Sequence, residues 1–183
     1  MLELNFNPFP VLTTERLVLR KFEYTDVPAF FEVRSNAQIM QYIARPLAKT
    51  TNDALDLIKV INDLLNSNNG ITWCISLKNS NEFIGSIGFW RIEKENYRAE
   101  IGYLLNPAFQ GSGLMQEAIK TVIQYGFGVM NLHSIQANVS PGNAASIKLL
   151  EKNNFVREAY FKEDHFHNGA FADTAVYTLL TKN

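Results

Sequence analysis

The sequence has little cysteine and no excess of charge of either sign, and each absence excludes a class of function. The single cysteine, Cys74, cannot form a disulfide within the chain, so we expect a reducing compartment and a cytoplasmic protein. Lysine and arginine number 17 and aspartate and glutamate 18, which gives a net charge of -1. A protein that binds nucleic acid by counterion release needs a basic excess, so we expect no nucleic-acid partner.

Long apolar runs are also missing. No run approaches the roughly 18 residues of a membrane-spanning helix, so we expect no membrane partner. The first residues lack the basic stretch and apolar stretch of a secretion signal. An apolar fraction of 46% and a charged fraction of 19% are ordinary for a globular protein. With 183 residues, the chain suits one domain that spans 1–183.

The spacing of apolar residues predicts a mixture of helices and strands. Helices are expected after Thr25-Asp26, which can cap the first of them, after Thr50-Thr51-Asn52, and at about 113–130 and 143–153. Strands are expected at 16–22, 72–77, 83–92, 98–105 and 134–139, with a last pair framing the hairpin signal Asn168-Gly169. This order of elements predicts an α+β fold with three layers, α/β/α.

The segment Gln110-Gly111-Ser112-Gly113 falls between a predicted strand and a predicted helix. Glycines let the backbone turn tightly and approach a ligand, and a helix start has unpaired N–H groups and partial positive charge. Such a loop can hold a pyrophosphate. A plain strand-to-helix turn explains the same residues. The spacing matches neither GxGxxG nor GxxxxGK[ST], which disfavours a dinucleotide or nucleoside-triphosphate site.

Several motifs, taken in order, resemble the GNAT acetyltransferase superfamily, and most closely the ribosomal-protein N-terminal alanine or serine acetyltransferases. The likeness covers nearly the whole chain. The residues that carry it are 14–20 at the start, Glu100-Ile101-Gly102-Tyr103-Leu104-Leu105, Phe109 to Gly113, Asn143-Ala144-Ala145-Ser146, 151–155, and 168–173 near the end.

The resemblance implies a fold and a cofactor. The sheet would be mixed and mostly antiparallel, with central parallel strands, 98–105 and 134–139, that splay apart to admit acetyl-CoA. Main-chain groups of Leu104 and Leu105 would pair with the pantetheine arm, loop amides would hold the pyrophosphate, and an amide at the end of strand 98–105 would stabilise the oxyanion. The residues assigned to the cofactor are Tyr103, Leu104, Leu105, Gln110, Gly111, Ser112, Gly113, Leu114, Met115, Asn138, Asn143 and Ser146.

The implied activity is an N-acetyltransferase that moves the acetyl group of acetyl-CoA to a primary amine by direct attack in a ternary complex. The amine would belong to a protein N-terminus or a small molecule, and the protein would be a monomer or homodimer. An aminoglycoside or polyamine acceptor is an alternative within this class. A CoA-binding sensor or interaction module without turnover is an alternative from another class.

Three positions depart from the broad family pattern. Met115 stands where Gly or Ala is usual, although the subgroup tolerates methionine. Asn154 replaces a glycine, and asparagine is the next-best residue for a left-handed helix end. Some relatives have a tyrosine acid where this chain has Leu150. The acid is therefore expected elsewhere.

Ser146 is the candidate acid. It lies one helical turn from Asn143, on the same helix face, and matches a subgroup serine near the sulfur. A hydroxyl that only caps or bonds back within its own helix is the alternative explanation.

His165 is the candidate base, because it matches the position of a carboxylate in the subgroup and imidazole titrates near neutral pH. Glu100 is a second candidate, acting through a water, and its structural alternative is an ion pair with Arg98 or Arg16. His165 and His167 share one strand face, but no third ligand is apparent nearby, so no metal is expected.

Cys74 alternates with apolar residues and is expected in the core. Phe89 and Trp90 end a strand and are candidates to line the acceptor pocket, with core packing expected for at least one of them.

Overall fold

The computed structural model describes residues 1–167 and 169–181. Its strands are β1 (Leu12–Thr13), β2 (Leu17–Arg20), β3 (Ile71–Leu77), β4 (Phe83–Glu93), β5 (Arg98–Leu105), β6 (Ser134–Val139), β7 (Val156–His167) and β8 (Ala170–Leu180). Its helices are α1 (Val27–Ser35), α2 (Ala37–Met40), α3 (Thr51–Asn66), α4 (Leu114–Gly128) and α5 (Ala144–Lys152). Short 3-10 turns are η1 (Tyr24–Asp26), η2 (Lys94–Asn96) and η3 (Pro107–Phe109).

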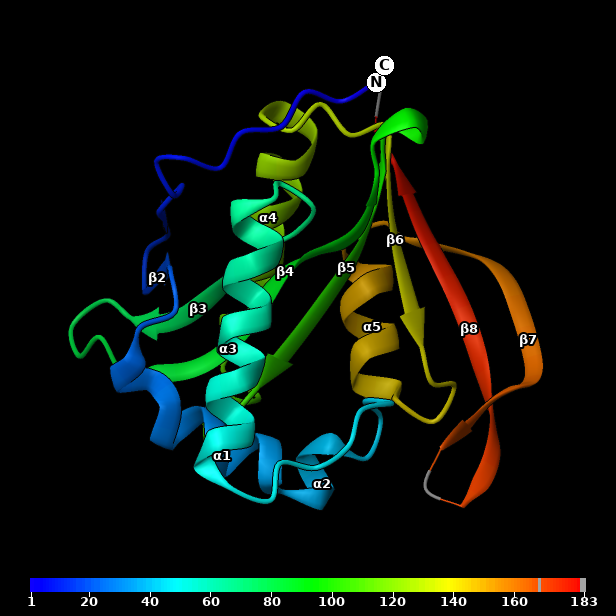
Figure 1. Ribbon diagram of the computed structural model, residues 1–183. Helices are drawn as coiled ribbons and strands as arrows, with labels where there is room; N and C mark the ends of the chain where they lie inside the picture. Colours follow the sequence, from blue (N-terminus) through cyan, green and yellow to red (C-terminus); the bar gives the residue numbers. More distant parts are fainter. Residues whose placement is uncertain (168, 182–183) are drawn as a thin grey trace.

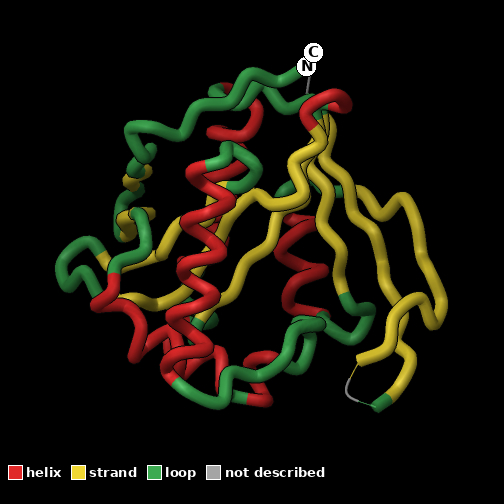
Figure 2. The backbone as a smooth tube through the Cα atoms, in the orientation of Figure 1, coloured by secondary structure: helices red, strands yellow, loops and turns green. Residues whose placement is uncertain are grey.

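The strands form one sheet in the order β1-β2-β3-β4-β5-β6-β8-β7. Within the described chain β5 and β6 pair in parallel, and the remaining neighbours pair antiparallel. Figure 1 shows α3 in front of the sheet and α4 and α5 behind it, and Figure 2 shows the same layering by colour. The α+β prediction of three layers, with a mixed and mostly antiparallel sheet, is confirmed.

Alternating side chains of the strands supply a separate apolar cluster to each face of the sheet. In β3, Trp73 and Ile75 enter the larger cluster, which includes residues of α4 and α5, whereas Cys74 enters the smaller cluster with α1 and α3. This is the period-two pattern of a strand covered on both faces. The predicted core position of Cys74 is confirmed, since its side chain is fully buried.

The two parallel strands separate after a short ladder. β5 pairs with β6 only from Arg98–Ser134 to Glu100–Gln136. Beyond Glu100 the two strands diverge, as Figure 1 shows, with α5 lying behind the gap. The splayed parallel strands implied by the family resemblance are therefore present, and they open the sheet in the middle.

The second predicted helix, α3, has the expected start. The Thr50 hydroxyl accepts the Asp53 N–H at 3.3 Å, and the Asp53 carboxylate accepts the Thr50 N–H at 2.9 Å. This reciprocal pair satisfies two donors at the helix start. Ile58 and Leu65 are buried as the spacing predicted, whereas Leu64 is 37% exposed and faces a cavity.

The prediction that Asp26 caps the first helix is corrected. Asp26 makes no side-chain cap to α1, because its carboxylate binds Arg20 at 2.7 and 2.8 Å and accepts the Glu23 N–H at 2.8 Å. Arg20 also reaches the Asn81 side chain at 2.6 Å. The short helix α2 was not predicted, since four residues are too few to show a helical period.

The end of α5 and the positions of β7 and β8 agree with what the sequence predicted. Asn154 has a φ of +64° just after α5, as expected of an asparagine in a left-handed helix end. β7 and β8 flank the predicted hairpin, whose Asn168 lies outside the described residues. Among the helices of the described chain, none combines the length and apolarity needed to cross a membrane.

Candidate active site

A cavity of about 700 Å³ lies where β5 and β6 diverge. Both strands contribute to its lining, together with α1, α3, the segment after α2, the start of α5 and part of β7. The segment after α2 reaches the β6–α5 connection, because a Cβ built on Gly142 would lie 3.4 Å from Cε1 of Tyr42. The guanidinium, carboxylate and imidazole groups of the lining belong to Arg34, Arg45, Arg91, Glu100, Asp164 and His165.

The predicted anion loop has the backbone shape that glycine allows. Gly111 and Gly113 have φ values of +77° and +81°, and Gly113 is the residue that caps the start of α4. The Ser112 hydroxyl donates to the Phe109 carbonyl at 3.0 Å, which stabilises the turn. Because α4 is a 15-residue helix, its first N–H groups and its dipole would favour an anion at the exposed loop.

Arg16 lies beside this loop as one partner of an ion pair. Its Nη1 donates to the Ser112 carbonyl at 2.9 Å, and its Nε donates to the Glu117 carboxylate at 2.8 Å. Glu117 also accepts the Thr14 hydroxyl. The segment between β1 and β2 is thereby bonded to the start of α4.

The remaining loop residues have structural contacts of their own. Gln110 is exposed, and its side-chain Nε2 donates to the Leu105 carbonyl at 3.1 Å, which links the loop to the end of β5. Leu114 is buried in the larger cluster, and Met115 packs against it. The loop residues 110–113 lie outside the lining of the cavity.

A pair of hydroxyls lies in the cavity wall. The Tyr103 and Ser146 oxygens are 2.6 Å apart, joining β5 to α5 across the opening. Burial raises the pKa of the Tyr103 hydroxyl to about 12, although the Ser146 contact opposes the shift. Ser146 thus has a partner outside its own helix. Asn143 caps α5, and its side-chain oxygen accepts the Ser146 N–H at 3.0 Å.

Glu100 lies on the cavity side of β5 and is 9% exposed. Burial raises the pKa of its carboxyl, and Arg91, with Nη1 3.2 Å away, opposes that shift. The predicted pairing with Arg98 or Arg16 is wrong, because Arg98 binds Glu93 at 2.6 Å and Arg16 binds Glu117. Asn138 of β6 also lines this part of the cavity and accepts a hydrogen bond from Gln136 at 2.9 Å.

His165 lines the same cavity from β7. Its Nδ1 is 3.1 Å from Asp164 Oδ1, and the Thr174 hydroxyl donates to that carboxylate oxygen at 2.8 Å. His167, two residues along, lies instead in a smaller second hollow with Arg45 and Pro46. Within residues 1–167 and 169–181, no three His, Cys, Asp or Glu side chains come close enough to hold a metal.

Of the aromatic candidates, Phe89 is fully buried in the core and Trp90 lines the cavity. Leu150, at the position where some relatives have tyrosine, is fully buried in the larger cluster. Sequence reasoning missed the Tyr103 hydroxyl as a chemical group, and it missed Arg34 and Arg45. The alternation of side chains along β5 was a sequence signal for Tyr103, but the contact between Tyr103 and α5 depends on how the chain folds.

Comparisons with known proteins agree with this geometry. A family model described as Acetyltransferase (GNAT) domain matches residues 16–156. YoaA of Bacillus subtilis (strain 168), an uncharacterized N-acetyltransferase, is 34% identical over 172 residues, 94% of this chain and 97% of YoaA. The ribosomal-protein-serine acetyltransferase of Escherichia coli (strain K12) is 33% identical over 99 residues, 54% of this chain and 55% of that enzyme. The structure of spermidine N-acetyltransferase from Vibrio cholerae, in complex with CoA and spermine, has a TM-score of 0.81 at 25% identity and covers 91% of this chain and 96% of that one.

The family model spans most of the chain, and the likeness to YoaA extends along nearly all of it. The resemblance inferred from the sequence motifs is confirmed, and the relatives include a ribosomal-protein acetyltransferase. The chain belongs to the GNAT family and is an N-acetyltransferase that takes its acetyl group from acetyl-CoA.

Proposed function

We propose that the acceptor is a primary amine, of a protein N-terminus or of a small molecule, and that it attacks acetyl-CoA directly while both are bound. The observation that carries this proposal is the contact between the Tyr103 and Ser146 hydroxyls in the wall of the cavity that also contains Glu100 and His165. This cavity can supply an acid to the departing thiolate and a base to the incoming ammonium.

The residues present fit acetyl-CoA, which supplies an activated acyl group as a thioester. In the described chain β5 has no β6 partner beyond Glu100, so the main-chain groups of 101–104 on that side are open to an amide-containing arm. The N–H groups of Gly113 and Leu114 at the start of α4 suit the pyrophosphate, and Arg16, which is paired with Glu117, lies beside them.

Ser146 and Tyr103 form the proposed acid. Because burial raises the pKa of Tyr103 to about 12, the phenol keeps its proton at neutral pH. Two neutral hydroxyls 2.6 Å apart share one hydrogen bond, which leaves the second hydrogen for a nearby sulfur. Tyr103 thus fills the role for which some relatives use a tyrosine at the position of Leu150.

His165 is the proposed base. With its Nδ1 hydrogen directed at Asp164, its Nε2 is left as the proton acceptor. Glu100 is the second candidate, because burial raises the pKa of its carboxyl and it lies in the same cavity. An ammonium must lose a proton before it can attack, and these two groups are the candidates to receive that proton in the cavity.

Release of free thiol from acetyl-CoA, measured against a panel of amines, tests the proposal. We expect Ser146→Ala and Tyr103→Phe each to lower kcat by about a hundredfold or more. The double variant should be no slower than the slower single variant, because the two hydroxyls act as a unit. Tyr160→Phe is the matched control, since its hydroxyl contacts Asp173 outside the cavity. Binding of CoA with no turnover of any amine would support a sensor instead.

The pH dependence of two further variants identifies the base. When a base is removed, solvent deprotonates more of the amine as the pH rises, so the deficit in rate should shrink at high pH. We expect this behaviour for His165→Gln. For Glu100→Gln we expect a deficit that is constant with pH, as for a group that binds the amine. The reverse pattern would assign the base to Glu100.

A further inference from the structure

The part of the cavity that faces α1 and the segment after α2 has an excess of positive charge. Three guanidinium groups, of Arg34, Arg45 and Arg91, line the cavity with the carboxylates of Glu100 and Asp164. Glu100 is paired with Arg91, and Asp164 with His165. In the described part of the chain, neither Arg34 nor Arg45 has a carboxylate within salt-bridge distance.

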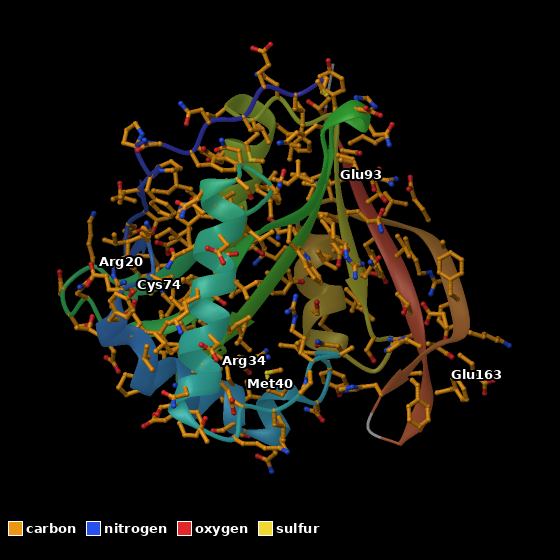
Figure 3. The ribbon with its side chains drawn as sticks, viewed as in Figure 1. Arg20, Arg34, Met40, Cys74, Glu93 and Glu163 are labelled. Atoms are coloured by element: carbon orange, nitrogen blue, oxygen red, sulfur yellow. The ribbon has the colours of Figure 1, made fainter. Side chains whose placement is uncertain are left out.

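Arg34 is the most unusual of these groups because it is only 7% exposed. Its Nε has no hydrogen-bond partner within residues 1–167 and 169–181, and its other nitrogens meet only the Met40 sulfur at 3.2 Å and the Pro46 carbonyl at 3.5 Å. Figure 3 shows the side chains of Arg34 and Met40 next to each other. Burial and the nearby Arg45 lower the pKa of Arg34 to about 10. A buried guanidinium with such weak acceptors is costly unless an anion joins it.

Trp90 extends the part of the cavity wall that these arginines form. Its indole Nε1 is buried and, like Arg34 Nε, has no partner in the described chain. The guanidinium carbons of Arg45 and Arg91 lie 4.9 and 4.7 Å from the centre of its ring. Such contacts hold guanidinium groups in place without neutralising them. We call Arg34, Arg45, Arg91 and Trp90 the arginine wall, and all four residues line the cavity.

We propose that the amine acceptor also carries a carboxylate, and that Arg34, with Arg45, binds this carboxylate in the arginine wall. The proposal rests on the proposed transfer of an acetyl group to an amine at the same site. The planar donor fork of arginine matches a carboxylate, which supplies the acceptors that Arg34 lacks. Two sources share this chemistry, a free amino acid and a peptide with an acidic residue near its N-terminus.

The same excess of positive charge disfavours the binding of a polycationic acceptor. The three guanidinium groups outnumber the two carboxylates of the cavity, and this excess of positive charge repels an acceptor such as spermidine. The phosphates of acetyl-CoA are a poor match for Arg34, because the predicted phosphate loop 110–113 lies outside the cavity lining and precedes α4. Arg34 lies on a different element from the loop, because it belongs to α1, whose apolar side packs with α3 in the smaller cluster.

Paired acceptors that differ only in the carboxylate test the proposal. One pair is an amino acid and its α-carboxamide, and the other is a short peptide with glutamate or glutamine at its second position. Whichever pair contains the true source should show a kcat/KM roughly 10- to 100-fold higher for the carboxylate member. Spermidine should be a poorer acceptor than that member. Equal rates within both pairs, or a preference for the amides or spermidine, would overturn the proposal.

Arg34→Gln should bring the ratio of the two kcat/KM values close to one, mainly through a higher KM for the carboxylate acceptor. Arg34→Lys should recover only part of the ratio, because it keeps the charge and loses the fork. Arg98→Gln is the matched control, since Arg98 pairs with Glu93 outside the cavity. A ratio unaffected by Arg34→Gln, with a raised KM for acetyl-CoA, would assign Arg34 to the cofactor and contradict the proposal.

A binding measurement separates this inference from the proposed function. Calorimetry on the CoA-bound protein compares the N-acetylated amino acid with its N-acetylated carboxamide, and needs no turnover. Failure of every amine in the thiol assay contradicts the acetyl transfer. If the carboxylate is also bound no better than the amide, the carboxylate site is contradicted as well. Turnover of amines without any carboxylate preference contradicts the carboxylate site alone.

Discussion

Cys74 shows how burial changes the chemistry of a single residue. Its side chain is fully buried in the cluster with α1 and α3, and burial raises the pKa of the thiol from 9.0 to about 12. Between these two pH values the unfolded chain loses a proton that the folded chain keeps. The stability that the protonated thiol contributes is therefore complete below pH 9 and is lost as the pH rises toward 12.

From pH 8 to pH 10 this thiol alone should lower the free energy of unfolding by about 1.4 kcal/mol. Urea unfolding at the two pH values measures the change. Cys74→Ala leaves a small void and should be less stable at both pH values, but its stability should fall less between them by about the same amount. An identical pH dependence in the two proteins would show that the thiol does not titrate differently on folding.

Single residues were predictable from sequence when a local pattern determined their surroundings. The alternation of β3 was enough to place Cys74 in the core, and a left-handed position suited Asn154. The hydroxyl of Tyr103 was not predictable as a partner of Ser146, because 43 residues separate them in the chain. The predicted partner of Glu100 was wrong for a different reason, since the β4–β5 pairing brings Arg91 beside it, and the composition of the two strands does not reveal that register.

At the scale of elements, the loop before α4 carries the predicted pyrophosphate site. Gly111 has a φ of +77°, and a Cβ built there would meet nothing within 4 Å. Gly111→Ala therefore adds backbone strain alone, whereas Gly111→Asp adds the same strain and a negative charge. We expect the aspartate variant to bind CoA at least about tenfold more weakly than the alanine variant, since it repels the pyrophosphate.

Calorimetric titration with CoA measures both affinities. Gly169→Asp is a matched control, because Gly169 also has a positive φ, of +85°, and open space around its Cβ, but lies in the turn before β8. An unchanged CoA affinity in Gly111→Asp would refute the assignment of this loop.

Most helices and strands were predictable because their apolar residues recur at a clear helical or strand spacing, or because a clear turn or capping signal ends them. The bounds of β5 and β6 agree with the sequence, α5 begins within a residue of its predicted position, and α3 begins two residues earlier than predicted, at Thr51. The separation of β5 from β6 was expected only from the family resemblance. Apolar spacing marks where a strand is and says nothing about how far its neighbour stays paired with it.

For the whole molecule, the pair of Arg20 and Asp26 connects β2 to the start of α1. Arg20 is 8% exposed, Asp26 is 4% exposed, and Asn81 of the β3–β4 turn joins them. Arg20→Met should lower the free energy of unfolding by about 3–5 kcal/mol, because it leaves the Asp26 charge buried without its cation. Adding Asp26→Asn should restore part of this loss. Denaturant unfolding measures each change.

Arg98→Met is the comparison for this prediction. Its partner Glu93 and Arg98 itself are each 42% exposed at their side chains, so the loss should stay below about 1 kcal/mol. Equal losses for Arg20→Met and Arg98→Met would contradict the role of the buried pair. The single domain over 1–183 and the monomer or homodimer stay predictions, which light scattering and limited proteolysis can test.

The opening between β5 and β6 has an evolutionary consequence. The contacts proposed for the cofactor come largely from the main chain, which every residue type supplies, whereas the arginine wall is made of side chains. Point mutations can therefore change the preferred acceptor while the donor remains acetyl-CoA. A lineage built on this scaffold can diversify its substrates by small steps, and each intermediate keeps a working donor site.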